Sequence, residues 1–122
     1  MTIKLAWALV LVAAGAVPAL ADPCSEPIPP APVDGATATK EQINQAREDT
    51  VNFIKASDDY QSCLFADLKA QKLQAAKDKK PFPPSIEDAV NQKVQDNQKE
   101  KEKVGGEYNA AAITYKNKHP GS

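Results

Sequence analysis

The sequence predicts an all-α protein: an antiparallel two-helix hairpin with a proline-rich, extended N-terminal arm that is tethered by one disulfide. Residues 39–80 carry apolar side chains at helical spacing and contain neither glycine nor proline. A second helical pattern covers residues 85–118, after a short proline-rich stretch. The two cysteines of the chain lie in the arm and on the first helix. Two long helices with facing apolar stripes are expected to pack as a short coiled coil.

The chain is short and its charges are balanced. It has 122 residues, a formal net charge of −1 and 6% aromatic residues. This composition supports one small domain with a narrow core. Without an excess of basic residues, nucleic acid is not expected as a partner.

Residues 1–21 have the pattern of a secretory signal peptide. Lys4 precedes an apolar run over residues 5–17, and residues 19–21, Ala-Leu-Ala, place small side chains at the cleavage positions. An uncleaved membrane anchor is one alternative, but the run is shorter than the roughly 20 residues that span a bilayer. A lipoprotein is the other, but Cys24 follows Asp22-Pro23 and not small residues directly after a leucine. We expect a mature chain from Asp22, exported to the periplasm or the medium, both of which are oxidising.

Residues 22–38 form the expected arm, because their prolines favour an extended polyproline II conformation. Asp34-Gly35 predicts a turn before the first helix. Ile28 and Val33 are the arm residues expected to touch the helices.

Cys24 and Cys63 are expected to form an intramolecular disulfide; an intermolecular bridge or two free thiols are the alternatives. The arm from Cys24 to Thr39 spans up to about 46 Å as polyproline II. The helix from Thr39 to Cys63 rises about 36 Å. The arm is therefore long enough to return along the helix, and Cys63 lies on the flank of the apolar stripe, where such an arm would attach.

The first helix is expected over about 39–80. Thr39 and Gln42 predict a capping box at its start. Pro81 and the next prolines stop it, so residues 81–84 form a stiff turn. The second helix is expected over about 85–118, capped by Ser85.

With the turn centred near Phe82, Tyr60 is expected opposite Val104 and Tyr108 opposite Ser57. The glycine pair 105–106 is interpreted as a site of close packing in preference to a hinge, since two glycines inside a helix cost about 2 kcal/mol relative to alanines. The residues predicted to pack in the seam are Phe53, Tyr60, Leu64, Val104, Gly105, Tyr108 and Tyr115.

No catalytic, cofactor-binding or metal-binding set is expected. His119 is the single histidine and lies in a tail that is expected to fray. With both cysteines in a disulfide, no zinc ligand set remains. Neighbouring acidic residues such as Glu48 and Asp49 splay apart on a helix and are expected to be solvated.

Several short segments carry a resemblance: residues 60–64 (Tyr-Gln-Ser-Cys-Leu), 97–98 (Asn-Gln), 104–111 (Val-Gly-Gly-Glu-Tyr-Asn-Ala-Ala) and 115–116 (Tyr-Lys). The chain resembles a group of small exported proteobacterial proteins that have a proline-rich cysteine arm and two helices. The resemblance implies an exported helical protein and assigns no activity.

The function expected is that of a non-enzymatic periplasmic interaction or envelope-associated protein. Val51, Leu73 and Ile113 lie off the main stripes and are the predicted contacts for a protein partner or a second copy of the chain. The alternative is a chaperone-like or lipid-surface-binding amphipathic protein. The balanced charge argues against a membrane surface as the partner.

Overall fold

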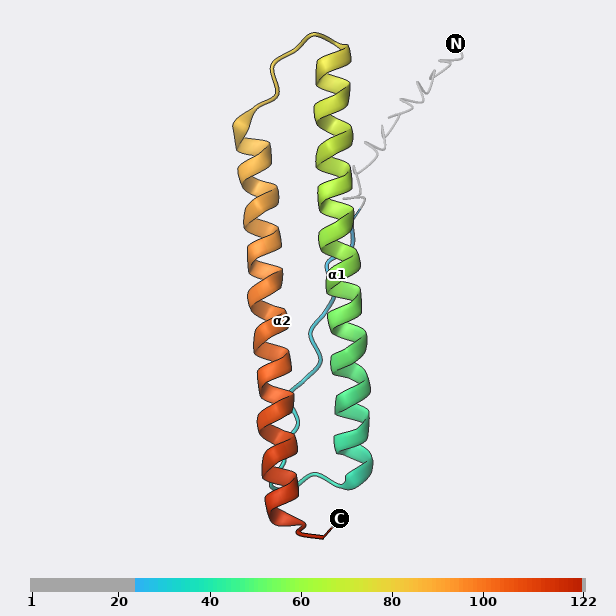
Figure 1. The fold of residues 1–122 in the computed structure, drawn as a ribbon, viewed down its shortest axis with the longest axis vertical. Coiled ribbons are helices and arrows are strands. Elements are labelled where there is room, and N and C mark those ends of the chain that lie inside the picture. Colours follow the sequence, from blue (N-terminus) through green and yellow to red (C-terminus); the bar gives the residue numbers. More distant parts are fainter. Residues whose placement is uncertain (1–23, 122) are drawn as a thin grey trace, which may run out of the picture.

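The computed structural model describes residues 24–121, so the expected signal peptide, residues 1–21, lies outside the described residues. Within residues 24–121 the chain forms two helices and no strand. Helix α1 spans Lys40–Lys77 and helix α2 spans Pro84–Lys118. They lie side by side, joined at one end by a short connector (Figure 1). The all-α prediction is confirmed for this part of the chain.

The start of α1 is fixed by Thr39, as the sequence predicts. Its hydroxyl accepts a hydrogen bond from the backbone N–H of Gln42 at 3.1 Å, and the Gln42 side chain accepts one from the N–H of Thr39 at 2.8 Å. This capping box is confirmed, and it satisfies two backbone donors at the helix start that would otherwise lack partners.

Helix α1 ends at Lys77, earlier than the expected Lys80. The N–H of Lys79 donates to the carbonyl of Ala76, and the N–H of Lys80 donates to that of Ala75. These two bonds make a Schellman motif, with Lys79 in the left-handed region at φ 51°. The earlier end follows from Pro81, because a residue that precedes proline is disfavoured in the helical region.

Helix α2 begins at Pro84, and the predicted Ser85 cap is wrong. The residue before the helix is Pro83, and no side chain caps this end. Proline suits the first helical position because its φ is already helical and its missing N–H would have no partner there. Pro84 therefore starts the helix and places Ser85 inside it.

Contacts between the helices run in opposite order along the two sequences. Near the connector, Lys72 pairs with Glu87 at 2.8 Å. Halfway along, the Gln61 amide donates to Asn97 at 2.8 Å. At the far end, Ala111 of α2 packs in one cluster with Ile43.

The register expected between the helices is wrong. Ser57 faces Asn97, which donates to it at 3.2 Å, and does not face Tyr108. Tyr60 lies in a cluster against which Val90 and Val94 of α2 pack, and Val104 is not part of that cluster. The error arises at the connector, because the chain leaves α1 several residues before Phe82 and the centre of the turn moves with it.

The core is a narrow line of side chains along the helix seam, closed by the arm. The buried apolar residues are Cys24, Ala38, Ile43, Phe53, Tyr60, Leu64, Leu68, Val104 and Ala111. The described part of the arm, residues 24–38, runs beside the helices (Figure 1). Between it and the helices remains a void of about 20 Å³, room for roughly one water molecule. The arm thus supplies the third wall of the core.

Of the two arm residues expected to touch the helices, one packs against the core and the other is exposed to solvent. Val33 packs against a cluster of Ala38, Ile43 and Ala111. Ile28 is 89% exposed, so the expectation that it would pack against the helices is wrong. Tight packing in this part of the arm is instead made by Gly35, which is buried against Ala111.

Candidate interaction surfaces

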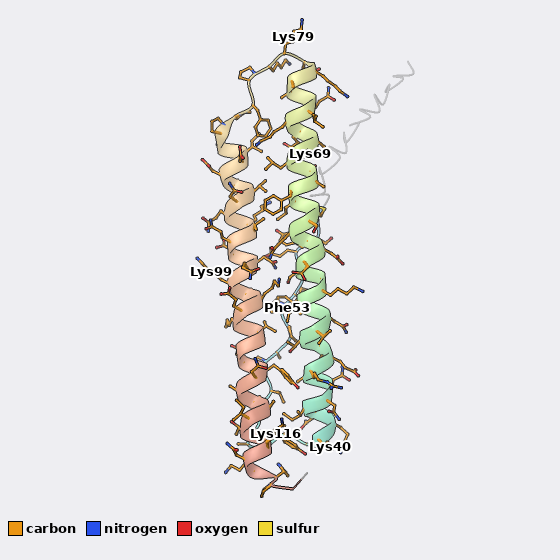
Figure 2. The ribbon with its side chains drawn as sticks, viewed as in Figure 1. Lys40, Phe53, Lys69, Lys79, Lys99 and Lys116 are labelled. Atoms are coloured by element: carbon orange, nitrogen blue, oxygen red, sulfur yellow. A yellow bond between two sulfur atoms is a disulfide. The ribbon has the colours of Figure 1, made fainter. Side chains whose placement is uncertain are left out.

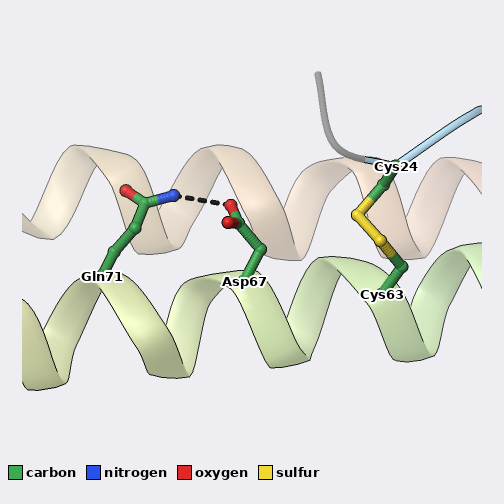
Figure 3. Close-up of a disulfide and its surroundings, with 4 residues drawn as sticks. All are labelled: Cys24, Cys63, Asp67 and Gln71. Carbon is green, nitrogen blue, oxygen red and sulfur yellow. Dashed lines mark hydrogen bonds between the residues drawn. A yellow bond between two sulfur atoms is a disulfide. The ribbon is translucent and has the colours of Figure 1, made fainter. Parts of the chain in front are cut away.

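The arm is joined to α1 by a disulfide between Cys24 and Cys63, whose Cα atoms are 5.7 Å apart. Figure 3 shows the bridge one turn from Asp67, which accepts a 2.6 Å hydrogen bond from Gln71. Cys24 is 4% exposed and packs with Tyr60 and Leu64. The disulfide is therefore part of the core as well as a covalent tie.

A polar layer crosses the middle of the seam. Asn97 is 3% exposed and Ser57 is fully buried. The Asn97 amide donates to the Ser57 hydroxyl at 3.2 Å and accepts from Gln61 at 2.8 Å. Beside this layer, at the edge of the seam, Lys101 forms an ion pair with Asp58. No buried side-chain nitrogen or oxygen in the described residues lacks a hydrogen-bond partner, so the layer satisfies its own polar groups.

The seven residues predicted to pack in the seam fall into two groups. Four are buried: Phe53, Tyr60, Leu64 and Val104. Three are half-buried: Gly105, Tyr108 and Tyr115. All four buried residues lie towards the middle of the helix pair. The two tyrosines of α2 lie nearer the end that is remote from the connector.

The glycine pair of α2 lies inside an unbroken helix, which rules out a helix break in this structure. A Cβ added at Gly105 or Gly106 would meet nothing within 4 Å. Close packing therefore does not require glycine at either position, and this interpretation is wrong. The described structure gives no packing reason for the pair.

Several large apolar side chains are open to solvent. Val51 is 59% exposed, Leu73 is 55% exposed and Ile113 is 61% exposed. The structure thus leaves the three predicted contact residues accessible. Phe65 is 47% exposed although its spacing places it near the seam stripe. Val51 and Phe65 are two heptads apart, so they share one side of α1.

A hollow lies at the end of the helix pair that is remote from the connector. It has a volume of about 310 Å³ and draws on both helices but on no residue of the arm. Its lining residues are Lys40, Ile43, Asn44, Arg47, Tyr108, Ala112, Tyr115 and Lys116. Figure 2 places Lys40 and Lys116 at this same end.

One wall of this hollow is held by an aromatic stack. The ring of His119 lies 4.2 Å from that of Tyr115, at an interplanar angle of 22°. The Nδ1 atom of His119 is 3.0 Å from the Tyr115 carbonyl oxygen. The backbone N–H of His119 also donates to the carbonyls of Tyr115 and Lys116, so His119 is the C-cap of α2.

The described residues contain no group of three or more His, Cys, Asp and Glu side chains placed to hold a metal ion. Among these same residues, neither α1 nor α2 has an apolar stretch of the length that crosses a membrane. No protein-family model, curated protein or solved structure matches this chain.

Three features of these surfaces are missed by sequence reasoning. Asn97 is not among the seam residues expected from the sequence, although its helical spacing with Val104 and Ala111 is a signal that it lies in the seam. Gly35 reads as a turn residue, and nothing local indicates its contact with α2. The hollow depends on the register of the helices, which the sequence alone places wrongly.

Proposed function

We propose that this chain is an exported, non-enzymatic interaction protein of the periplasm or cell envelope. In this proposal, residues 1–21 direct export and are removed. The mature chain is an antiparallel helical hairpin with its proline-rich arm tied by the disulfide. A disulfide with one buried cysteine supports an oxidising compartment, because such bonds persist there and are rare in reducing ones.

One observation carries the interaction role: Val51, Leu73 and Ile113 are each more than half exposed on a small scaffold with a narrow core. When a partner covers exposed apolar side chains of this size, their removal from water contributes favourably to the free energy of binding. Each lies on a helix, so its position is fixed before binding and little conformational freedom is lost.

Site-specific cross-linking tests this role. A photoreactive amino acid is placed at Val51, Leu73 or Ile113 in cells that export the protein, with Lys99 as the control position. Figure 2 shows Lys99 on the outer side of α2, away from α1. We expect defined cross-linked bands from at least one apolar position and none from Lys99. Equal, diffuse labelling from all four positions would contradict the role.

The test also separates a second copy from a different partner, since a cross-linked product of twice the mass of the chain would indicate self-association. The alternative function, a lipid-surface or chaperone-like protein, predicts flotation with anionic vesicles at low salt. Flotation without cross-links to protein would favour that alternative.

A further inference from the structure

The hollow between the ends of the helices has the character of a small-molecule site. Its volume of about 310 Å³ falls at the lower end of the range of roughly 300–1,000 Å³ that is usual for ligand pockets. Ile43 and Ala112 contribute apolar side chains to its lining, and Tyr108 and Tyr115 contribute aromatic ones. Apolar and aromatic walls with a few polar groups are the usual composition of such sites.

All the charged side chains that line the hollow are positively charged. Lys40, Arg47 and Lys116 contribute cations, and no acidic residue lines the hollow. Within the described residues, none of these three cations is within 4.0 Å of a carboxylate. The N-terminus of α1 and the C-terminus of α2 meet at this end, so their opposed dipoles largely offset. The positive character therefore comes from the side chains.

We propose that this hollow binds a small aromatic acid, with its carboxylate at the cations and its flat apolar body against the tyrosine rings. Arg47 is the one arginine of the chain, and a guanidinium can hold a carboxylate through two parallel hydrogen bonds. The stacked pair of Tyr115 and His119 gives one side a flat aromatic surface that is ordered before the ligand arrives. The proposal does not rest on the interaction role.

The probe for the test is 2-naphthoate, and 2-naphthalenemethanol is its neutral counterpart. Each is titrated into the oxidised, 15N-labelled protein while amide chemical shifts are followed. A ligand of this size in a half-open site is expected to bind with a Kd on the order of 0.1–1 mM. We expect saturable shifts around residues 40–47 and 108–116, with the acid binding about fivefold or more tightly than the alcohol.

Three variants test the assignment of residues. Arg47→Gln removes the exposed guanidinium and is expected to weaken naphthoate about fivefold, with little effect on the alcohol. Lys99→Gln makes the same kind of change away from the hollow and should leave both affinities unchanged. Ala112→Phe fills the hollow and should abolish saturable shifts for both probes, while the amide spectrum away from the hollow stays that of the parent.

Several results would overturn the proposal: equal affinities for the acid and the alcohol, equal losses from Arg47→Gln and Lys99→Gln, or shifts that do not saturate. Full binding by a folded Ala112→Phe variant would also overturn it. Because Arg47 is exposed, its variant remains informative even if Ala112→Phe does not fold. None of these results bears on cross-linking from Val51, Leu73 and Ile113, so the two proposals fail separately.

Discussion

Gly35 of the arm lies directly against the backbone of Ala111 in α2. A Cβ added to Gly35 would lie 2.9 Å from the Ala111 Cα and closer still to its carbonyl group. Backbone atoms cannot move aside as the end of a flexible side chain can. The arm therefore packs on α2 here by backbone approach, far from its covalent attachment to α1.

Gly35→Ala is expected to destabilise the protein by about 3 kcal/mol or more, because the methyl group has no room and the arm must lift from α2. Gly105→Ala is the matched control: its methyl group meets open space inside a helix, so it should stabilise by about 1 kcal/mol. Urea denaturation of both oxidised variants measures the difference. Equal effects of the two substitutions would contradict the contact.

Asn97→Ala is expected to cost about 1–3 kcal/mol, since it removes the partner of the fully buried Ser57 hydroxyl and one acceptor of Gln61. The double variant Ser57→Ala with Asn97→Leu should recover much of that loss, because it removes both buried polar partners together. Asn91→Ala, on the exposed side of α2, is the control and should change stability little. A loss from Asn91→Ala as large as that from Asn97→Ala would contradict a specific polar layer.

Lys79→Gly is expected to stabilise the protein by about 1 kcal/mol. Lys79 holds the left-handed conformation at the end of α1, which costs a residue with a side chain roughly 1–2 kcal/mol and costs glycine far less. Lys80→Gly is the control: its φ is not in that region, so glycine there adds only disorder to the unfolded chain. Thermal unfolding compares the two. A higher Tm for Lys80→Gly than for Lys79→Gly would contradict a stability cost of the left-handed conformation at Lys79.

Removal of the disulfide is expected to cost about 4 kcal/mol in the chain-entropy model, because the bridge joins residues 39 apart in the sequence. Replacing both cysteines by serine should lower the denaturation midpoint and release the arm. Release is measured as faster amide exchange at Thr37 and Ala38, whose N–H groups donate to the Asp34 carbonyl, since Ala38 packs in one cluster with Ile43 of α1 and Ala111 of α2. Retained protection of these amides in the double serine variant would show that the arm does not need its covalent tie.

The helices are predictable from the sequence because their signals are local. The apolar spacing of α1, the capping box at Thr39 and the block at the prolines each act within a few residues. The disulfide is also predictable from the sequence, since a chain with two cysteines allows one internal pair and the length of the arm permits that pair to form.

The register and the tightest contact are not predictable, because they depend on how one segment lies on another. A Schellman motif at Lys79 and a proline start at Pro84 shift the turn, and this shift moves every facing pair along the seam. The approach of Gly35 to Ala111 depends on the path of the arm. The hollow depends on both, so its residues appear on two helices with no shared local motif.

Intact mass of the protein recovered from outside the cytoplasm of expressing cells, alkylated with and without prior reduction, tests the tethered arm most directly. Export and an intramolecular bridge predict a monomer that begins at Asp22, takes no alkyl group while folded and oxidised, and takes two after reduction in denaturant. Two alkylated thiols without reduction, or a disulfide-linked dimer, would contradict that bridge.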